Sequence, residues 1–163
     1  MAQRISLVVG AVASLVGVPF AAHAQATAGR AEFVNVPGQP APPGYSHAVV
    51  VRGGQLVFLS GQVAIDATGR IVGKGDFPTQ VARALDNLRA ALAAVGATPA
   101  DLVKLNYYVV GLDHDKLIAL REARDRFIDR AHPPASTLAG VQVLFNEDCL
   151  VEIEAVATVP ERK

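Results

Sequence analysis

The sequence predicts an α+β fold, in which one mixed β-sheet carries two helices on a single face. Segments with the apolar spacing of helices alternate along the chain with segments of strand composition. Two strands joined by a short turn are expected at each end of the domain. Helices separated by strands, with hairpins at both ends, suggest a single mixed sheet with the element order ββ(β)αβαββ.

The first strands are expected at 47–52 and 56–63. Gly53 and Gly54 between them predict a β-hairpin. A second turn at 66–69 is rich in turn-forming residues and leads into a short strand at 70–72.

Two helices follow, each with its own start signal. Asp76 can cap the first helix, which Gly96 ends. Asp113 can cap the second helix, expected over 114–131 and stopped by the two prolines after it. An apolar strand with β-branched and aromatic residues at 102–110 separates the two helices.

The last two strands are expected at 136–144 and 149–159, joined by a short polar turn. On the last strand Val151, Ile153 and Ala155 share the face that should pack on the helices. The other face carries Leu150, Glu152, Glu154 and Val156. Because no helix is left to cover that face, its apolar residues predict self-association.

Composition sets the class of protein. The chain has 163 residues, enough for one domain with a real core, and 51% of them are hydrophobic. Its formal net charge is zero and its charges are scattered, so no basic stripe suggests nucleic acid as a partner. Cys149 is the single cysteine, which excludes an internal disulfide and favours a buried structural role.

Residues 1–24 have the pattern of a signal peptide. Arg4 precedes the apolar stretch 5–18, and Ala22-His23-Ala24 fits the small-x-small cleavage rule. The apolar stretch is shorter than the roughly 20 residues of a spanning helix. We expect cleavage after Ala24 and a periplasmic or secreted protein without membrane attachment. An uncleaved membrane anchor is the alternative.

The segment that would follow cleavage, 25–43, is rich in Pro, Gly and Ala. It is expected to be a surface arm without secondary structure, leading into one domain at 44–163.

Short motifs over about 43–159 resemble the RidA family, also called the YjgF family. Each motif is common by itself, and their order and spacing carry the resemblance. They are Gly44-Tyr45-Ser46, Leu59-Ser60-Gly61-Gln62, Gln80 with Leu85-Asp86-Asn87-Leu88, Val103-Lys104, Pro133 with Ser136-Thr137, and Val151-Glu152-Ile153-Glu154-Ala155.

This resemblance implies a chorismate-mutase-like fold that assembles as a homotrimer, with three sheets around a central barrel and ligand clefts at the subunit interfaces. Family members hydrolyse enamines and imines, such as 2-iminobutanoate and 2-iminopropanoate, to 2-keto acids and ammonia. They use no cofactor and no metal. An arginine holds the substrate carboxylate, and a glutamate positions or activates the water.

Carried onto this chain, the resemblance places the catalytic glutamate at Glu152. The family's arginine falls on Ala135, which can make none of its contacts. Loss of such a donor costs at least ~2–4 kcal/mol of transition-state stabilisation, so deaminase activity is expected to be reduced or altered. The other substrate-binding positions are Tyr45 (an aromatic lid), Ser60, Gly61 and Gln62 (a backbone-lined wall), Ser136, and Thr137 (beside the family's arginine).

Two arginines of the second helix are candidates to replace the missing cation. Arg124 falls near the middle of the helix's apolar face and Arg121 at its edge. They could form a relocated anion site. The alternative is that both reach the rim or pair with acids such as Asp125 or Glu154.

Glu152 and Glu154 lie on one strand face, about 7 Å apart. Glu152 could act as a general base, whereas both could instead make hydrogen bonds between subunits. His47, His114 and His132 stand singly, without the spacing of metal ligands. Among them, His47 follows Tyr45 at the expected mouth of the cleft.

Three functions remain open at this stage. The first is an exported hydrolase of the imine deaminase type with altered activity, acting on a small ligand such as a carboxylic acid or an imine. The second is a protein of the same fold that binds or scavenges a small molecule without catalysis. The third is a structural or interaction protein.

Overall fold

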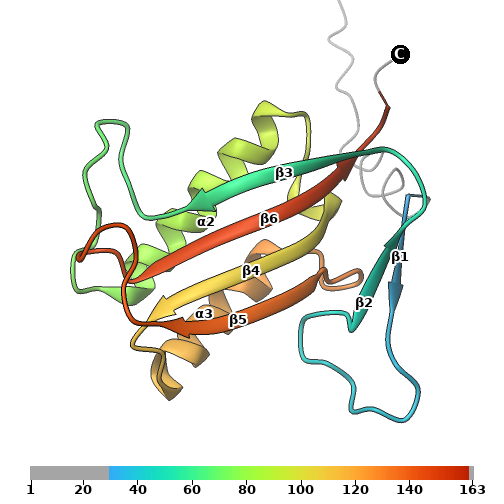
Figure 1. Ribbon diagram of the computed structural model, residues 1–163, viewed down its shortest axis with the longest axis horizontal. Helices are drawn as coiled ribbons and strands as arrows, with labels where there is room; N and C mark the ends of the chain where they lie inside the picture. The colour runs from blue at the N-terminus through green and yellow to red at the C-terminus, as the bar shows by residue number, and fades with distance from the viewer. Residues whose placement is uncertain (1–29, 162–163) are drawn as a thin grey trace, which may run out of the picture.

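The computed structural model describes residues 30–161 (Figure 1). The expected signal peptide, 1–24, and the start of the expected arm, 25–29, lie outside this range. Within 30–161 no helix is both long and apolar enough to cross a membrane. In chain order the elements are β1 (Ala31–Val34), β2 (Ala48–Val51), β3 (Gln55–Gln62), α2 (Phe77–Ala94), the 3-10 turn η1 (Pro99–Asp101), β4 (Leu102–Val110), α3 (His114–Phe127), β5 (Ala135–Val141) and β6 (Val151–Val159).

The main sheet has four strands in the order β3-β6-β4-β5. Strand β6 runs antiparallel to both β3 and β4, while β4 and β5 are parallel and are connected through α3. Helices α2 and α3 cover one face, behind the sheet in Figure 1, and the other face has no helix over it. The α+β class, with a mixed sheet and both helices on one face, is confirmed.

The expected first hairpin is wrong. Strand β2 pairs with β1 in a separate two-stranded sheet, and β3 pairs with β6. The chain does turn at Gly54 (φ 87°), where a Cβ would lie 2.5 Å from the carbonyl oxygen of Val159. This turn therefore carries the chain across the end of β6, from one sheet to the other.

Strand β1 lies in the segment that was expected to have no secondary structure. Arg30, just before it, donates to Asp101 at 3.0 Å and accepts from the backbone N–H of Arg52 at 2.6 Å. The first contact holds the start of β1 at η1, and the second holds it beside the end of β2. The composition of the segment did not indicate this strand, because the strand is only four residues long and is followed by a Pro- and Gly-rich loop.

The second expected hairpin is also wrong, because β4 lies between β5 and β6. A parallel pair needs a crossover, which α3 supplies, so β5 is placed on the far side of β4. The expected strand at 70–72 reduces to one isolated bridge, Ile65 to Ile71.

The predicted helix starts are confirmed. Asp76 accepts from the N–H of Thr79 at 3.2 Å, and Asp113 accepts from the N–H of Lys116 at 2.8 Å. Helix α3 ends at Phe127, earlier than expected, since the side chain of Asp129 accepts the N–H of Ala131 at 2.9 Å in a turn of its own. The core between helices and sheet includes Val81, Leu85, Leu88, Leu92, Leu105, Val109, Val151, Ile153 and Ala155.

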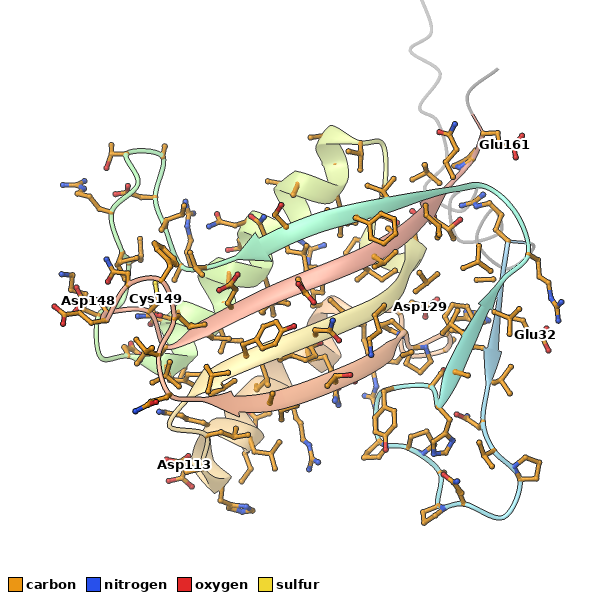
Figure 2. The ribbon with its side chains drawn as sticks, viewed as in Figure 1. Glu32, Asp113, Asp129, Asp148, Cys149 and Glu161 are labelled. Carbon is orange, nitrogen blue, oxygen red and sulfur yellow. The ribbon has the colours of Figure 1, made fainter. Side chains whose placement is uncertain are left out.

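We call the uncovered side of the main sheet the open face. It presents alternate residues of β3, β6, β4 and β5, and Figure 2 shows their side chains with no helix in front of them. Phe58 and Leu56, both on β3, are 77% and 49% exposed there. Apolar side chains this exposed indicate a surface suited to association.

Candidate functional site

The residues predicted to form one site lie on two faces of the sheet. The pairing of β4 with β6 sets Tyr108 opposite Glu152 and Tyr107 opposite Ile153. Since side chains alternate along a strand, Glu152 lies on the open face and Tyr107 faces the helices. The pairing of β4 with β5 likewise places Ala135 and Thr137 on the open face and Ser136 on the helix side.

Glu152 meets the backbone of β3 at Gly61. A Cβ built on Gly61 would lie 1.8 Å from Oε1 of Glu152, so this approach requires glycine. The register of β3 against β6 shifts between Leu59 and Gln62, and such irregularities often re-aim side chains near functional sites. Within residues 30–161 the Glu152 carboxylate makes no hydrogen bond or ion pair, which leaves its oxygens available to water or a ligand.

The two residues beside Gly61 continue the same stretch of β3. Ser60 is exposed, and its carbonyl oxygen accepts the side-chain amide of Gln62 at 3.0 Å. Of these three positions, Gly61 is the one that the structure places against the Glu152 carboxylate. Ser60 and Gln62 are its neighbours on β3.

The Glu154 carboxylate accepts hydrogen bonds within the subunit, in contrast to that of Glu152. Its Oε1 accepts from the amide of Asn106 at 2.6 Å and from the hydroxyl of Tyr108 at 3.0 Å. The hydrogen bond to this carboxylate, with burial and the negative charges nearby, raises the pKa of Tyr108, so its hydroxyl remains a donor. Glu154 therefore organises the open face within one subunit.

A cation does lie beside Ala135, and the sequence analysis missed it. Lys104 on β4 is the register partner of Ala135, and its Nζ donates to the hydroxyl of Thr137 at 2.7 Å. The signal was available in the strand alternation, which puts Lys104 on the same face as Asn106 and Tyr108. This alternation identifies Lys104 as a neighbour of Ala135 only when β4 and β5 are known to be parallel partners. The hairpin expected between the last two strands excluded that pairing.

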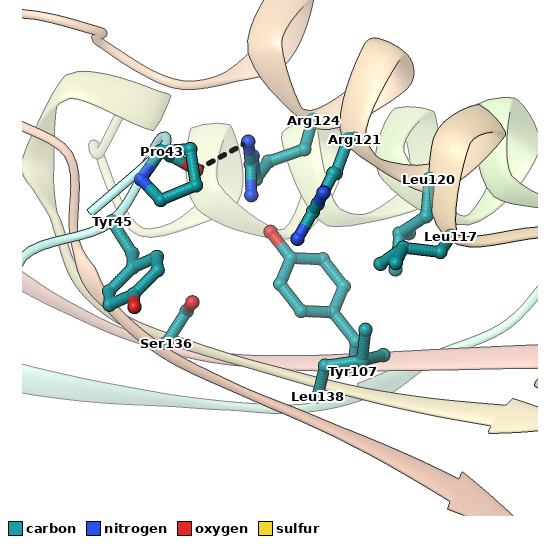
Figure 3. A pocket seen from close by; sticks show the side chains of 9 residues that line it. All are labelled: Pro43, Tyr45, Tyr107, Leu117, Leu120, Arg121, Arg124, Ser136 and Leu138. Carbon is teal, nitrogen blue, oxygen red and sulfur yellow. Dashed lines mark hydrogen bonds between the residues drawn. The ribbon is translucent and has the colours of Figure 1, made fainter. Parts of the chain in front are cut away.

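Tyr45, Ser136, Arg121 and Arg124 come together on the helix side of the sheet. They line a cavity of about 270 Å³ between α3, β4, β5 and the loop before β2 (Figure 3). The remaining lining residues are Pro43, Tyr107, Leu117, Leu120 and Leu138. We call this space the helix-side cavity.

The two arginines differ in their surroundings. Arg124 is 8% exposed, in agreement with its place on the apolar face of the helix. It donates to the Asp125 carboxylate at 2.6 Å and to the carbonyl oxygen of Pro43 at 3.0 Å. Arg121 is exposed and makes no hydrogen bond or ion pair with the rest of the described chain. Pairing with Asp125, one of the expected alternatives, thus holds for Arg124.

His47, His132 and Cys149 make structural contacts. His47 Nδ1 accepts the N–H of Val36 at 3.1 Å, and His132 lies 3.0 Å from the Asp129 carboxylate. Burial raises the pKa of the Cys149 thiol in the loop just before β6, which makes it a poor nucleophile (Figure 2). Across the described range no group of three or more His, Cys, Asp or Glu side chains is arranged to hold a metal ion.

Comparison with known proteins places the chain in a family. The family model described as Endoribonuclease L-PSP matches residues 38–159. A RutC family protein of Pyrococcus abyssi is 36% identical over 120 residues, which cover 72% of this chain and 89% of that protein. A 2-iminobutanoate/2-iminopropanoate deaminase of Dermatophagoides farinae is 28% identical over 128 residues, covering 78% of this chain and 95% of that protein.

A solved structure supports the same assignment. The crystal structure of YyfB, a protein of the Rid family from Yersinia pestis, is 37% identical and superposes with a TM-score of 0.76. The matched region covers 80% of this chain and 99% of the YyfB chain. The matched segment contains both helices and the whole main sheet, so the sequence and the fold agree that this chain belongs to the RidA family.

Proposed function

We propose that this protein is a hydrolase of small imines that works on the open face, with Glu152 as its general base. The observation that carries the proposal is the contrast between two carboxylates on one strand. Glu154 is held by Asn106 and Tyr108, whereas Glu152 stands unpaired against the backbone of Gly61. A carboxylate without internal partners, beside a backbone-lined wall, is suited to hold and deprotonate a water molecule.

The proposed reaction adds water to the C=N bond of a 2-imino acid. Glu152 takes a proton from the water as its oxygen bonds to the imine carbon, and the nitrogen is protonated as the C=N bond becomes single. The resulting carbinolamine then loses ammonia and leaves a 2-keto acid. An enamine enters the same route after its tautomerisation to the imine.

Lys104 is the proposed contact for the substrate carboxylate. It lies beside Ala135, the position on which the resemblance places the family's arginine, and its ammonium group donates to the hydroxyl of Thr137. A lysine provides a point charge rather than a planar fork, so it binds a carboxylate but orients it less strictly. Reduced or altered deaminase activity is the expected result.

The rest of the site is proposed to come from further copies of the chain. A homotrimer in which open faces meet would cover Phe58 and Leu56 and would enclose Glu152 in a cleft. The signal-like pattern at 1–24 supports action outside the cytoplasm after its removal.

Hydrolysis of freshly generated 2-iminopropanoate by the protein tests this proposal. Glu152→Gln is expected to abolish turnover. Lys104→Met should lower kcat/KM by about ten- to hundredfold, the effect of losing a hydrogen bond from a charged donor. Ala135→Arg should raise the rate only while Glu152 is intact. Lys74→Met, an exposed lysine on a loop, is the control.

Two results would overturn the proposal. One is turnover that survives Glu152→Gln. The other is an unmodified protein and an Ala135→Arg variant that both bind the 2-keto acid without hydrolysing the imine. The second result would favour a binding protein of the same fold, because the ligand would still bind while an arginine at position 135 failed to bring hydrolysis back.

A further inference from the structure

The carboxylate of Glu154 uses only one of its two oxygens. Its Oε1 accepts the hydrogen bonds from Asn106 and Tyr108, whereas its Oε2 has no partner within residues 30–161. The amide nitrogen of Asn106 donates to Glu154 at 2.6 Å, and its Oδ1 is buried without a partner. A buried acceptor without a donor costs stability, so native proteins seldom retain one without a reason. The centre of the open face therefore presents two acceptors that lack a donor.

These acceptors lie between the cation and the base of the proposed reaction. Thr137, Asn106 and Glu154 are register partners across β5, β4 and β6. The Lys104 ammonium lies at one end of this row, where it donates to Thr137 at 2.7 Å. Glu152 lies two residues from Glu154 on the same face of β6, about 7 Å along the strand. A substrate with its carboxylate on Lys104 and its C=N carbon facing Glu152 thus brings its nitrogen to the middle of the row.

The chemistry of this row suits a nitrogen better than an oxygen. An imine nitrogen carries an N–H bond, and it gains hydrogens as the carbinolamine forms and ammonia leaves. Positive charge develops on it when it is protonated, so an adjacent carboxylate stabilises the later stages of the reaction more than the bound imine. The 2-keto acid product has a carbonyl oxygen at the same place, which donates no hydrogen bond and is repelled by a carboxylate.

We infer that Glu154 and Asn106 form a nitrogen subsite on the open face, in which Glu154 Oε2 and Asn106 Oδ1 accept the N–H groups of the substrate. The subsite selects imines over the 2-keto acids with the same carbon skeleton and promotes release of the product. Tyr108 holds the Glu154 carboxylate in place through Oε1. This inference rests on the proposed hydrolysis at Glu152 for its reaction, but the binding preference that it predicts can be measured without turnover.

Two ligands that differ only in the group at the nitrogen position test the inference. 2-Amino-2-methylpropanoate carries an ammonium group where 2,2-dimethylpropanoate carries a methyl group. Isothermal titration calorimetry of the unmodified protein should give a Kd at least about tenfold lower for the amino acid, since a charged donor gains its acceptors. Glu152→Gln should keep most of this preference while it abolishes hydrolysis, so the subsite and the proposed function can fail separately.

Glu154→Gln changes the free oxygen into an amide donor and can keep both hydrogen bonds to Oε1. It should remove the preference for the amino acid. It should also lower the Kd of the product 2-oxopropanoate by about two- to tenfold, because the new N–H can pair with the carbonyl oxygen. A purely structural role of Glu154 would instead weaken binding of both ligands.

Two further variants complete the test. Asn106→Val removes the second acceptor and should reduce the preference for the amino acid by a smaller factor than Glu154→Gln. Glu122→Gln makes the same chemical change at an exposed position on α3, behind the sheet, and is the matched control. It should leave the Kd of every ligand unchanged.

Several outcomes would overturn the inference. These are absence of saturable binding, an equal Kd for the two ligands, or parallel weakening of the amino acid and 2-oxopropanoate in Glu154→Gln. A changed sedimentation coefficient of Glu154→Gln with an unchanged preference would do so as well, because the free oxygen would then pair with a neighbouring subunit. Imine hydrolysis without the preference would remove the nitrogen subsite and leave the proposed function in place, whereas the preference without hydrolysis would do the reverse.

Discussion

At the scale of single residues, Gly61 leaves less room for a Cβ than any other glycine within residues 30–161, because the Glu152 carboxylate lies against it. The Glu152 carboxylate occupies space that any side chain at position 61 would need, because a Cβ there would lie 1.8 Å from Oε1. The far end of a glutamate is flexible, so it can move away at small cost to stability. Its position beside the backbone would nevertheless be lost.

Gly61→Ala is therefore expected to reduce imine hydrolysis by about a hundredfold, comparable to removing one transition-state contact, with little change in Tm. Steady-state kinetics and thermal unfolding of the same preparation measure both effects. Gly53→Ala is the matched control, since no atom lies within 4 Å of a Cβ built there. Full activity in Gly61→Ala would mean that the position of Glu152 does not matter to the reaction.

At the scale of elements, Gln80 connects α2 to two loops at the end of the sheet. It is fully buried, and its amide nitrogen donates to the carbonyl oxygens of Gly73 at 3.2 Å and Asp148 at 2.7 Å. Its side-chain oxygen accepts the N–H of Leu150 at 2.8 Å. One side chain thereby satisfies three backbone groups and sets where β6 begins.

Gln80→Leu keeps most of the side-chain volume and removes all three hydrogen bonds. Buried backbone groups would lose their partners, so the free energy of unfolding should fall by roughly 2–4 kcal/mol. Urea unfolding measures this change. Gln142→Leu, at an exposed position, should shift the value by less than about 0.5 kcal/mol. A loss for Gln80→Leu no larger than that of the control would contradict the argument.

The start of α2 predicts a pH dependence. Hydrogen bonds from the Thr79 hydroxyl and N–H lower the pKa of Asp76 below its ordinary value of 3.8. A group whose pKa is lower in the folded state stabilises the protein above its unfolded pKa. That contribution is lost as the pH falls through the folded pKa.

Asp76→Ala should therefore lower the urea midpoint at pH 7 and have a smaller effect near pH 3, which is below the ordinary pKa of 3.8, because part of the stabilisation by the ionised cap is already lost there. Unfolding curves at both pH values measure the difference. Asp86 is an exposed aspartate within the same helix, and the effect of Asp86→Ala on the urea midpoint is not expected to become smaller at the lower pH. An equal effect of Asp76→Ala at both pH values would contradict the assigned cap.

At the scale of the whole molecule, local signals in the sequence were sufficient for some features. Asp76 and Asp113 cap their helices as expected, and the alternation of Val151, Ile153 and Ala155 identified the buried side of β6. The pairing of strands is not local, however. Gly53-Gly54 does mark a turn, but which strand lies beside β3 depends on contacts with β6, a hundred residues away.

The candidate site shows the same limit. Glu152 and Gly61 could be named from motifs, since each lies in a short recognisable segment. Lys104 could not be linked to Ala135 without the parallel register of β4 and β5. Without this register the sequence could not show that Ser136 and Thr137 lie on opposite faces of the sheet. For the same reason it could not show that the predicted site residues divide between the open face and the helix-side cavity.

Assembly is the property of the whole molecule that the open face predicts. Phe58, 77% exposed, lies on this face, and a stable interface would bury it against another copy. We expect the unmodified protein to be a trimer in sedimentation velocity. Phe58→Asp should shift it toward the monomer, because a carboxylate would be buried in an apolar contact without a partner.

Ile118→Asp is the matched control for this experiment. Ile118 is 43% exposed on α3, behind the sheet, so a charge there should leave the trimer intact. Imine hydrolysis measured on the same samples links assembly to function. If Phe58→Asp is monomeric and inactive while Ile118→Asp is trimeric and active, the catalytic cleft needs the neighbouring subunit. If monomeric Phe58→Asp keeps full activity, Glu152 works within a single chain, and the proposed cleft between subunits is wrong.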